Sequence, residues 1–141
     1  MKKFAMAVMI FTIFAIASAS HAATTCSNKP VSATMSSIDL ILDQYSPRAI
    51  VIVTIADKNG TPICNTKVNI KSDLNANDPK NGFAPGTVKI AAFGKGLTDT
   101  NGKAVFLLQT KGATGNTIFI SARGTKLGPK EGLPFSFNDG K

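Results

Sequence analysis

The stretch 48–72, RAIVIVTIADKNGTPICNTKVNIKS, most constrains what this chain can fold into. Val51, Val53 and Ile55 occupy every second position of its first half, and the second half, KVNIK, repeats the alternation. Apolar and polar residues that alternate with a period of two indicate strands with one buried side. Asn-Gly in 57–60 supplies the positive φ that a tight turn needs. We therefore predict a central β-hairpin with no reactive group.

Short alternating runs of the same kind recur along the chain, separated by Gly, Asn and Pro. The same turn chemistry, Asp-x-Asn-Gly, appears at Asp57 and again at Asp99. This pattern predicts an all-β fold, an antiparallel β-sandwich of about seven strands, with an up-and-down barrel as the structural alternative. Besides the hairpin, the predicted strands are 36–43, 87–93, 103–110, 117–123 and 133–138. The predicted core comprises Val51, Val53, Ile55, Val68, Ile70, Ala104, Phe106, Leu108, Ile118 and Ile120.

The N-terminus carries the pattern of an export signal. Lys2 and Lys3 precede the apolar run 4–17, and Ser20-His21-Ala22 follows it. A basic start, an apolar centre and a small-residue cleavage site are typical of a signal peptide, here 1–22. The run is short for a membrane span, so we expect cleavage and no transmembrane segment afterwards. Residues 23–35 are predicted to form an extended lead-in to a domain at 36–141, in a protein located in the periplasm, at the cell surface or outside the cell.

Two cysteines, Cys26 and Cys64, lie in the part of the chain that would be exported. An even count in an exported chain favours one disulfide, which would close a loop of 38 residues. Two free thiols or an intermolecular bridge are the alternatives. Two cysteines cannot form a zinc site without further ligands, and the only histidine, His21, lies in the signal region.

The remaining composition argues for binding rather than chemistry. Without a histidine after the signal region, no Ser-His-Asp or Cys-His pair can form, so we predict no enzyme activity. We expect no cofactor and no metal, because the Asp-x-Asn-Gly turns lack the ligand pattern of a calcium loop. The net charge of +8 is spread along the chain, which argues against nucleic-acid binding. Glycan binding stays open, although the chain has no Trp and one Tyr.

Four segments together resemble a known family. They are IVTIADKNGTP at 52–62, TKVNI at 66–70, LTDTNGKAVFLL at 97–108 and NTIFISA at 116–122. Their order is similar to that of the invasin and intimin type of bacterial immunoglobulin-like domain, the group-1 bacterial Ig-like (Big-1) domains, over residues 36–123. The resemblance implies an Ig-like sandwich and a non-enzymatic surface or periplasmic module, often in an adhesin. This chain shows one such domain, and adds the Cys pair and a longer loop at 74–86.

Apolar residues also fall on the side of some strands that should face outward. This set is a candidate partner patch, because contiguous exposed apolar area often marks an interface. We expect its members to lie on adjacent strands, unless loops or the C-terminal segment 133–137 cover them. The patch comprises Val105, Leu107, Phe119, Ile50 and Ile52.

These observations predict an exported Ig-like module that acts by protein–protein contact, with a protein partner or a second copy. One alternative is a subunit of an extracellular fibre, in which the segment 23–33 adds to a neighbour's sheet edge. Another is a small sandwich that binds a glycan or another ligand.

Overall fold

The computed structural model describes residues 25–73, 87–110 and 115–138. The proposed signal peptide 1–22 and the loop 74–86 lie outside the described residues. The strands are β1 (Ser37–Leu42), β2 (Arg48–Thr54), β3 (Val68–Ser72), β4 (Val88–Ala92), β5 (Lys103–Thr110), β6 (Gly115–Ala122), β7 (Thr125–Leu127) and β8 (Leu133–Ser136). A short 3-10 segment, η1 (Phe93–Gly96), follows β4.

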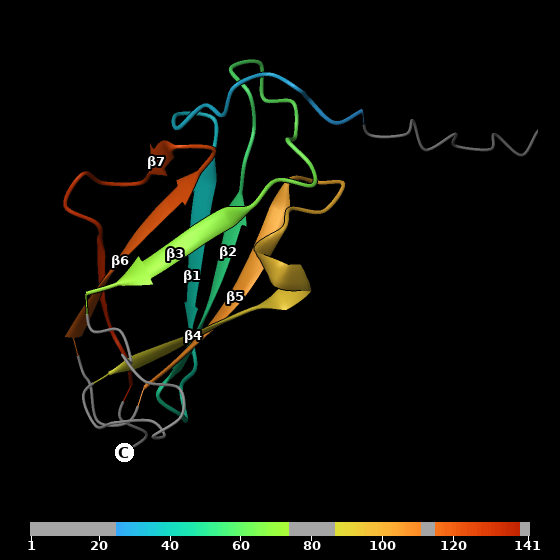
Figure 1. Cartoon of the computed structure of the whole chain (residues 1–141). Coiled ribbons are helices and arrows are strands. Elements are labelled where there is room, and N and C mark those ends of the chain that lie inside the picture. The colour runs from blue at the N-terminus through green and yellow to red at the C-terminus, as the bar shows by residue number, and fades with distance from the viewer. Residues whose placement is uncertain (1–24, 74–86, 111–114, 139–141) are drawn as a thin grey trace, which may run out of the picture.

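The strands form two antiparallel layers (Figure 1). One sheet has the order β1-β2-β5-β4. In the other, β6 pairs with β3 on one side and with β7 and β8 on the other. The predicted all-β sandwich is confirmed, and the described ranges contain eight strands in place of about seven. The added strand is β7, which lies in a Gly- and Lys-rich segment that lacks the alternation of a strand.

The inner sides of the two sheets meet in one core. All the residues predicted for it are buried, except Ile70, which is half-buried against it. Phe135 and Phe137 close one end of this core in an edge-to-face pair, with ring centroids 4.9 Å apart. Alternation therefore identified the buried side of each long strand correctly, because successive side chains of a strand point to opposite faces.

The prediction that 48–72 forms a central hairpin is wrong, because its two strands do not pair with each other. β2 pairs with β1 and β5, whereas β3 pairs with β6 in the other sheet. Only the base of the turn is paired, through a bridge between Ala56 and Pro62. Beyond Pro62, which cannot donate to a ladder, the chain crosses from one sheet to the other. The stretch is thus a link between the layers.

The two Asp-x-Asn-Gly segments form the same turn, as the sequence predicts. In the Asp57 turn, the carboxylate accepts hydrogen bonds from the N–H groups of Asn59 (2.8 Å) and Thr61 (3.0 Å). In the Asp99 turn, it accepts them from Asn101 (2.8 Å) and Lys103 (2.9 Å). Each aspartate side chain therefore caps its own turn backbone.

Candidate functional site

The outer side of the β1-β2-β5-β4 sheet carries a contiguous group of aliphatic side chains, which we call the apolar face. Strand register places Ile50 of β2 between Ile41 of β1 and Leu107 of β5. One row further along, Ile52 of β2 lies beside Val105 of β5. Ile41 is 52% exposed and Ile50 is 39% exposed, and the other three are half-buried. These five residues form one surface that crosses three strands.

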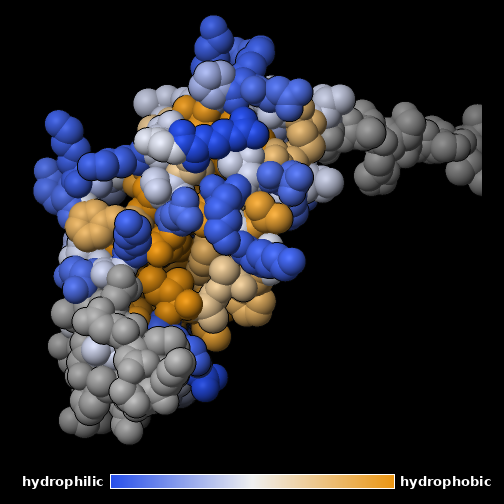
Figure 2. All heavy atoms as spheres, in the orientation of Figure 1, coloured by the Kyte–Doolittle hydropathy of each residue, from blue (hydrophilic) through white to orange (hydrophobic). Residues whose placement is uncertain are grey.

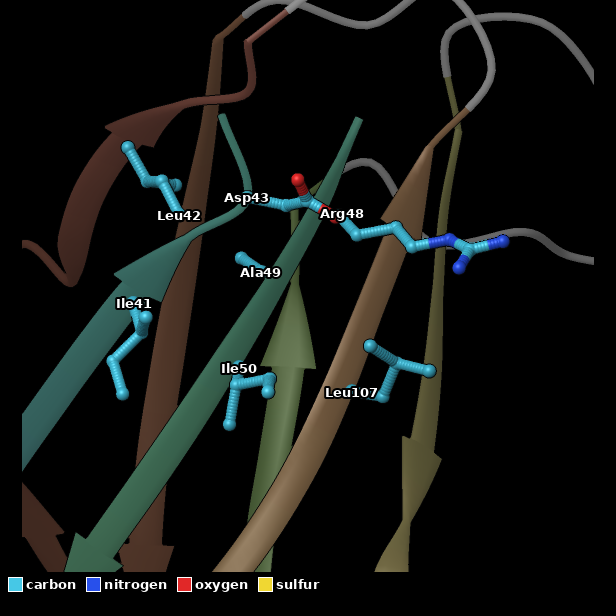
Figure 3. Close-up of a pocket in the computed structure, with 7 residues that line it drawn as sticks. All are labelled: Ile41, Leu42, Asp43, Arg48, Ala49, Ile50 and Leu107. Atoms are coloured by element: carbon cyan, nitrogen blue, oxygen red, sulfur yellow. The ribbon is translucent and has the colours of Figure 1, made fainter. Parts of the chain in front are cut away.

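A shallow depression of about 340 Å³ lies at one end of the apolar face. Ile41, Ile50 and Leu107 line it from three neighbouring strands, and the side chain of Arg48 extends from β2 across β5 (Figure 3). Asp43 lies at its border, where its carboxylate accepts hydrogen bonds from the Ser46 hydroxyl and the Tyr45 N–H. These bonds, the Ser46 bond first, lower the pKa of Asp43 below its ordinary value. The apolar surface is thus bordered by a fixed negative charge and a cation.

One residue of the candidate patch, Phe119, lies apart from the others. It belongs to β6, and β6 and β5 are in different sheets, so the expectation that they lie on adjacent strands is wrong. Phe119 is 44% exposed on the outer side of its own sheet. The structure therefore brings together Ile50, Ile52, Val105 and Leu107 and places Phe119 on the opposite outer side of the sandwich.

The C-terminal segment does not cover the apolar face. β8 pairs with β6 in the other sheet, and Phe135 and Phe137 turn into the core. Ile41 is the member of the face that the candidate patch lacked. Its signal was present in the sequence, because Ile41 follows Leu40, which packs against the core, and successive strand residues point to opposite sides.

The cysteine pair forms the predicted intramolecular disulfide. Cys26 and Cys64 are bonded, with their Cα atoms 5.4 Å apart. The N-terminal segment around this bond lies on the domain: the Ser27 N–H donates to the Pro62 carbonyl (2.8 Å), and the Ser32 N–H donates to the Ala56 carbonyl (2.8 Å). Val31 is buried in the core. Residues 26–32 are therefore attached to the sandwich at both ends.

No group of three His, Cys, Asp or Glu side chains in the described residues could hold a metal ion. Likewise, no helix within 25–73, 87–110 and 115–138 has the length and apolarity needed to cross a bilayer. The only histidine, His21, lies outside these residues.

Comparison with known proteins supports the fold. No family model and no curated protein matches the chain. Among solved structures, the Escherichia coli adhesin FdeC matches with a TM-score of 0.54 and 16% identity, over 80% of this chain and 33% of that chain. The Yersinia pseudotuberculosis adhesin InvE matches with a TM-score of 0.50 and 20% identity, over 77% of this chain and 27% of that one.

This chain spans about a third or less of the length of these two adhesin chains. At sequence identities of 20% and 16%, these matches show a similar fold, and the activities of those proteins do not carry over to this chain. The resemblance expected from the sequence is confirmed at the level of the fold: this chain is an immunoglobulin-like β-sandwich similar to domains of these bacterial adhesins.

Proposed function

We propose that this protein is an exported Ig-like module that acts by protein–protein contact through its apolar face. The observation that carries the proposal is the register that aligns Ile41, Ile50 and Leu107 across three strands on a solvent-facing side. An antiparallel sheet with one free face normally presents polar residues to water on that side. Aliphatic residues there lose contact with water only when another surface packs on them.

The border of the apolar face fits a protein partner. Protein interfaces commonly combine an apolar centre, depleted in charge, with a polar rim. Here Asp39 of β1 lies directly opposite Ile52 of β2. Asp43 and Arg48 border the depression. The rim would set the orientation of a partner, while the aliphatic centre supplies the contact area.

The fold and the disulfide support an exported location. Disulfides persist in oxidising compartments, such as the bacterial periplasm and the cell exterior. The two solved structures compared above are described as adhesins. Sequencing the N-terminus of the purified mature protein tests export directly. We expect cleavage after Ala22, and an intact Met1 would contradict it.

The fibre alternative has weaker support. It requires the segment 23–33 to leave its own domain and pair with a neighbour. Residues 26–32 are instead held by the disulfide and by backbone hydrogen bonds to Ala56 and Pro62. Negative-stain images of purified protein separate the two ideas, because polymers favour the fibre and a persistent monomer or discrete complex rejects it.

Site-specific photocrosslinking in cells tests the contact function. A photoreactive residue at Leu107 should yield a discrete protein adduct, and Ile50→Asp should abolish that adduct. Asn69 provides the matched control position, because it is exposed on the outer side of the other sheet. Equal adducts at both positions, or none at Leu107, would contradict the proposal.

A further inference from the structure

A second surface feature lies on the other sheet, away from the apolar face. A hollow of about 200 Å³ opens on the outer side of β3, β6 and β7. We call it the basic hollow. Its outward-facing lining consists of Phe119, Lys71, Ser121, Lys126, Pro129 and Lys130.

Strand pairing fixes how these residues lie. Lys71 of β3 is directly opposite Phe119 of β6, and Ser121 of β6 is directly opposite Lys126 of β7. The basic hollow is therefore built on two cross-strand pairs that share one side of the sheet. Figure 2 shows hydrophilic side chains gathered over β3, β6 and β7 on the side that faces the viewer, with hydrophobic atoms between them.

The turn after β7 forms the far wall and holds the aromatic ring. The Gly132 N–H donates to the Pro129 carbonyl (3.0 Å), which closes the turn. A Cβ atom at Gly132 would lie only 2.9 Å from Cε1 of Phe119, so the turn backbone packs directly against the ring. Phe119 is thus supported from the side of the turn while 44% of the residue stays exposed. A supported ring loses little freedom when a ligand packs on it.

The charge of the basic hollow is of one sign. Three lysines line it, and no acidic residue does. Asp73, which is close in the chain to Lys71, accepts a hydrogen bond from the Thr117 N–H (2.9 Å). Lys71, Lys126 and Lys130 are all exposed, so their ammonium groups can meet a ligand at low cost in desolvation. The site therefore complements an anion.

The concave shape of the basic hollow, its Phe119 ring and its lysines indicate which class of ligand fits it. Protein interfaces are depleted in lysine, which argues against a protein at this site. A bilayer surface favours apolar side chains that project from the protein, whereas this surface is concave. Concave sites with one aromatic wall and a few polar groups suit small rings. A pyranose presents an apolar C–H side to the ring and can carry a carboxylate to the lysines.

We propose that the basic hollow binds a carboxylated sugar unit of an acidic polysaccharide. The sugar ring packs on Phe119, the carboxylate pairs with the ammonium groups of Lys71, Lys126 and Lys130, and the Ser121 hydroxyl bonds a sugar hydroxyl. This site is independent of the apolar face, since the two lie on opposite outer sides of the sandwich.

Titration of the purified protein with an oligogalacturonate, followed by NMR, tests the proposal. We expect shifts confined to residues of the basic hollow, and binding that weakens as salt is raised. Phe119→Ala should weaken binding roughly tenfold, as expected for the loss of one aromatic stacking contact, and Lys126→Gln should weaken it by a smaller factor. The matched controls are Tyr45→Ala, at an exposed aromatic elsewhere, and Lys89→Gln, at an exposed lysine of the other sheet.

Three further probes decide whether a sugar is recognised or only charge. A neutral dextran oligosaccharide should not bind. Polyglutamate should bind more weakly than oligogalacturonate and should be insensitive to Phe119→Ala. Equal binding of polyglutamate, preference for phosphatidylglycerol vesicles, or no binding of oligogalacturonate would overturn the proposal, provided that the circular dichroism spectra of the variants match that of the parent protein.

Discussion

The Asp57 turn and the Asp99 turn have the same sequence pattern and the same local hydrogen bonds, yet different surroundings. Asp99 is exposed, whereas Asp57 is 1% exposed because the N-terminal segment covers it. The Ser27 hydroxyl donates to the Asp57 carboxylate at 2.6 Å. One turn is thus a surface loop, and the other is the attachment point of the N-terminal segment. Local sequence determines the turn, and the rest of the chain determines its role.

The disulfide beside the Asp57 turn should have the largest effect on stability. Replacing both Cys26 and Cys64 by Ser should lower the free energy of unfolding by about 4 kcal/mol, because a loop of 38 residues is freed in the unfolded state. Urea unfolding measures this change. The parent protein in reductant should match the double variant, and an unchanged midpoint in both would contradict the structural role of the bond.

The glycines of the two turns should differ in their tolerance of alanine. Both have a positive φ, 79° at Gly60 and 74° at Gly102. A Cβ at Gly102 would lie 2.5 Å from the Ile55 carbonyl, whereas at Gly60 it would meet only the flexible end of Met35 at 3.2 Å. We expect Gly102→Ala to cost about 2–4 kcal/mol and Gly60→Ala about 1–2 kcal/mol.

Thermal or urea unfolding of the two glycine variants checks the order. Equal losses would mean that the close approach of Gly102 to Ile55 contributes nothing beyond the φ requirement that both turns share.

Removing each aspartate side chain should separate the two turns further. Asp99→Ala loses the bonds that cap its turn, at a cost of about 1 kcal/mol, as for other local side-chain caps. Asp57→Ala should cost more, because it also leaves the Ser27 hydroxyl without its acceptor in a buried position. Urea unfolding of both variants, with Ser27→Ala alongside, measures the difference. Identical losses at 57 and 99 would contradict the attachment role.

Acid should weaken the Asp57 turn. The Ser27 bond first, and then the N–H groups of Asn59 and Thr61, lower the pKa of Asp57 below its ordinary value of 3.8, while burial opposes the shift. Because the pKa is lowered, ionisation of Asp57 stabilises the fold at pH values above 3.8. That stabilisation is lost as the pH falls through the pKa of the folded state. The stability difference between the parent protein and Asp57→Asn should therefore narrow as the pH falls below 3.8.

The acid experiment should include Asp43→Asn as a control, because the pKa of Asp43 is also lowered and Asp43 therefore also contributes to the loss of stability in acid. A stability difference at Asp57 that stays constant from neutral pH to strong acid would contradict the assignment.

Most of the apolar face could be predicted from the sequence, whereas the place of Phe119 and the basic hollow could not. Alternation identified Ile50, Ile52, Val105 and Leu107 as outward-facing, since the period of a strand fixes the side to which each residue points. It could not place Phe119, because the strands that meet are chosen by contacts far apart in the chain. The basic hollow was missed for the same reason: Lys71 lies on β3, about fifty residues before the segment that carries Lys126 and Lys130, and the two segments share no motif.

The sequence by itself predicted seven of the strands, their buried sides and the two aspartate turns, because each depends on local spacing, and the even cysteine count favoured a disulfide without deciding its pairing. Tertiary structure alone decided that β2 and β3 lie in different sheets, that β7 forms, and that one aspartate turn holds the N-terminal segment. Strand pairing joins residues distant in sequence through backbone hydrogen bonds, which every residue type but proline can make. The side-chain pattern therefore leaves the partner of each strand undetermined.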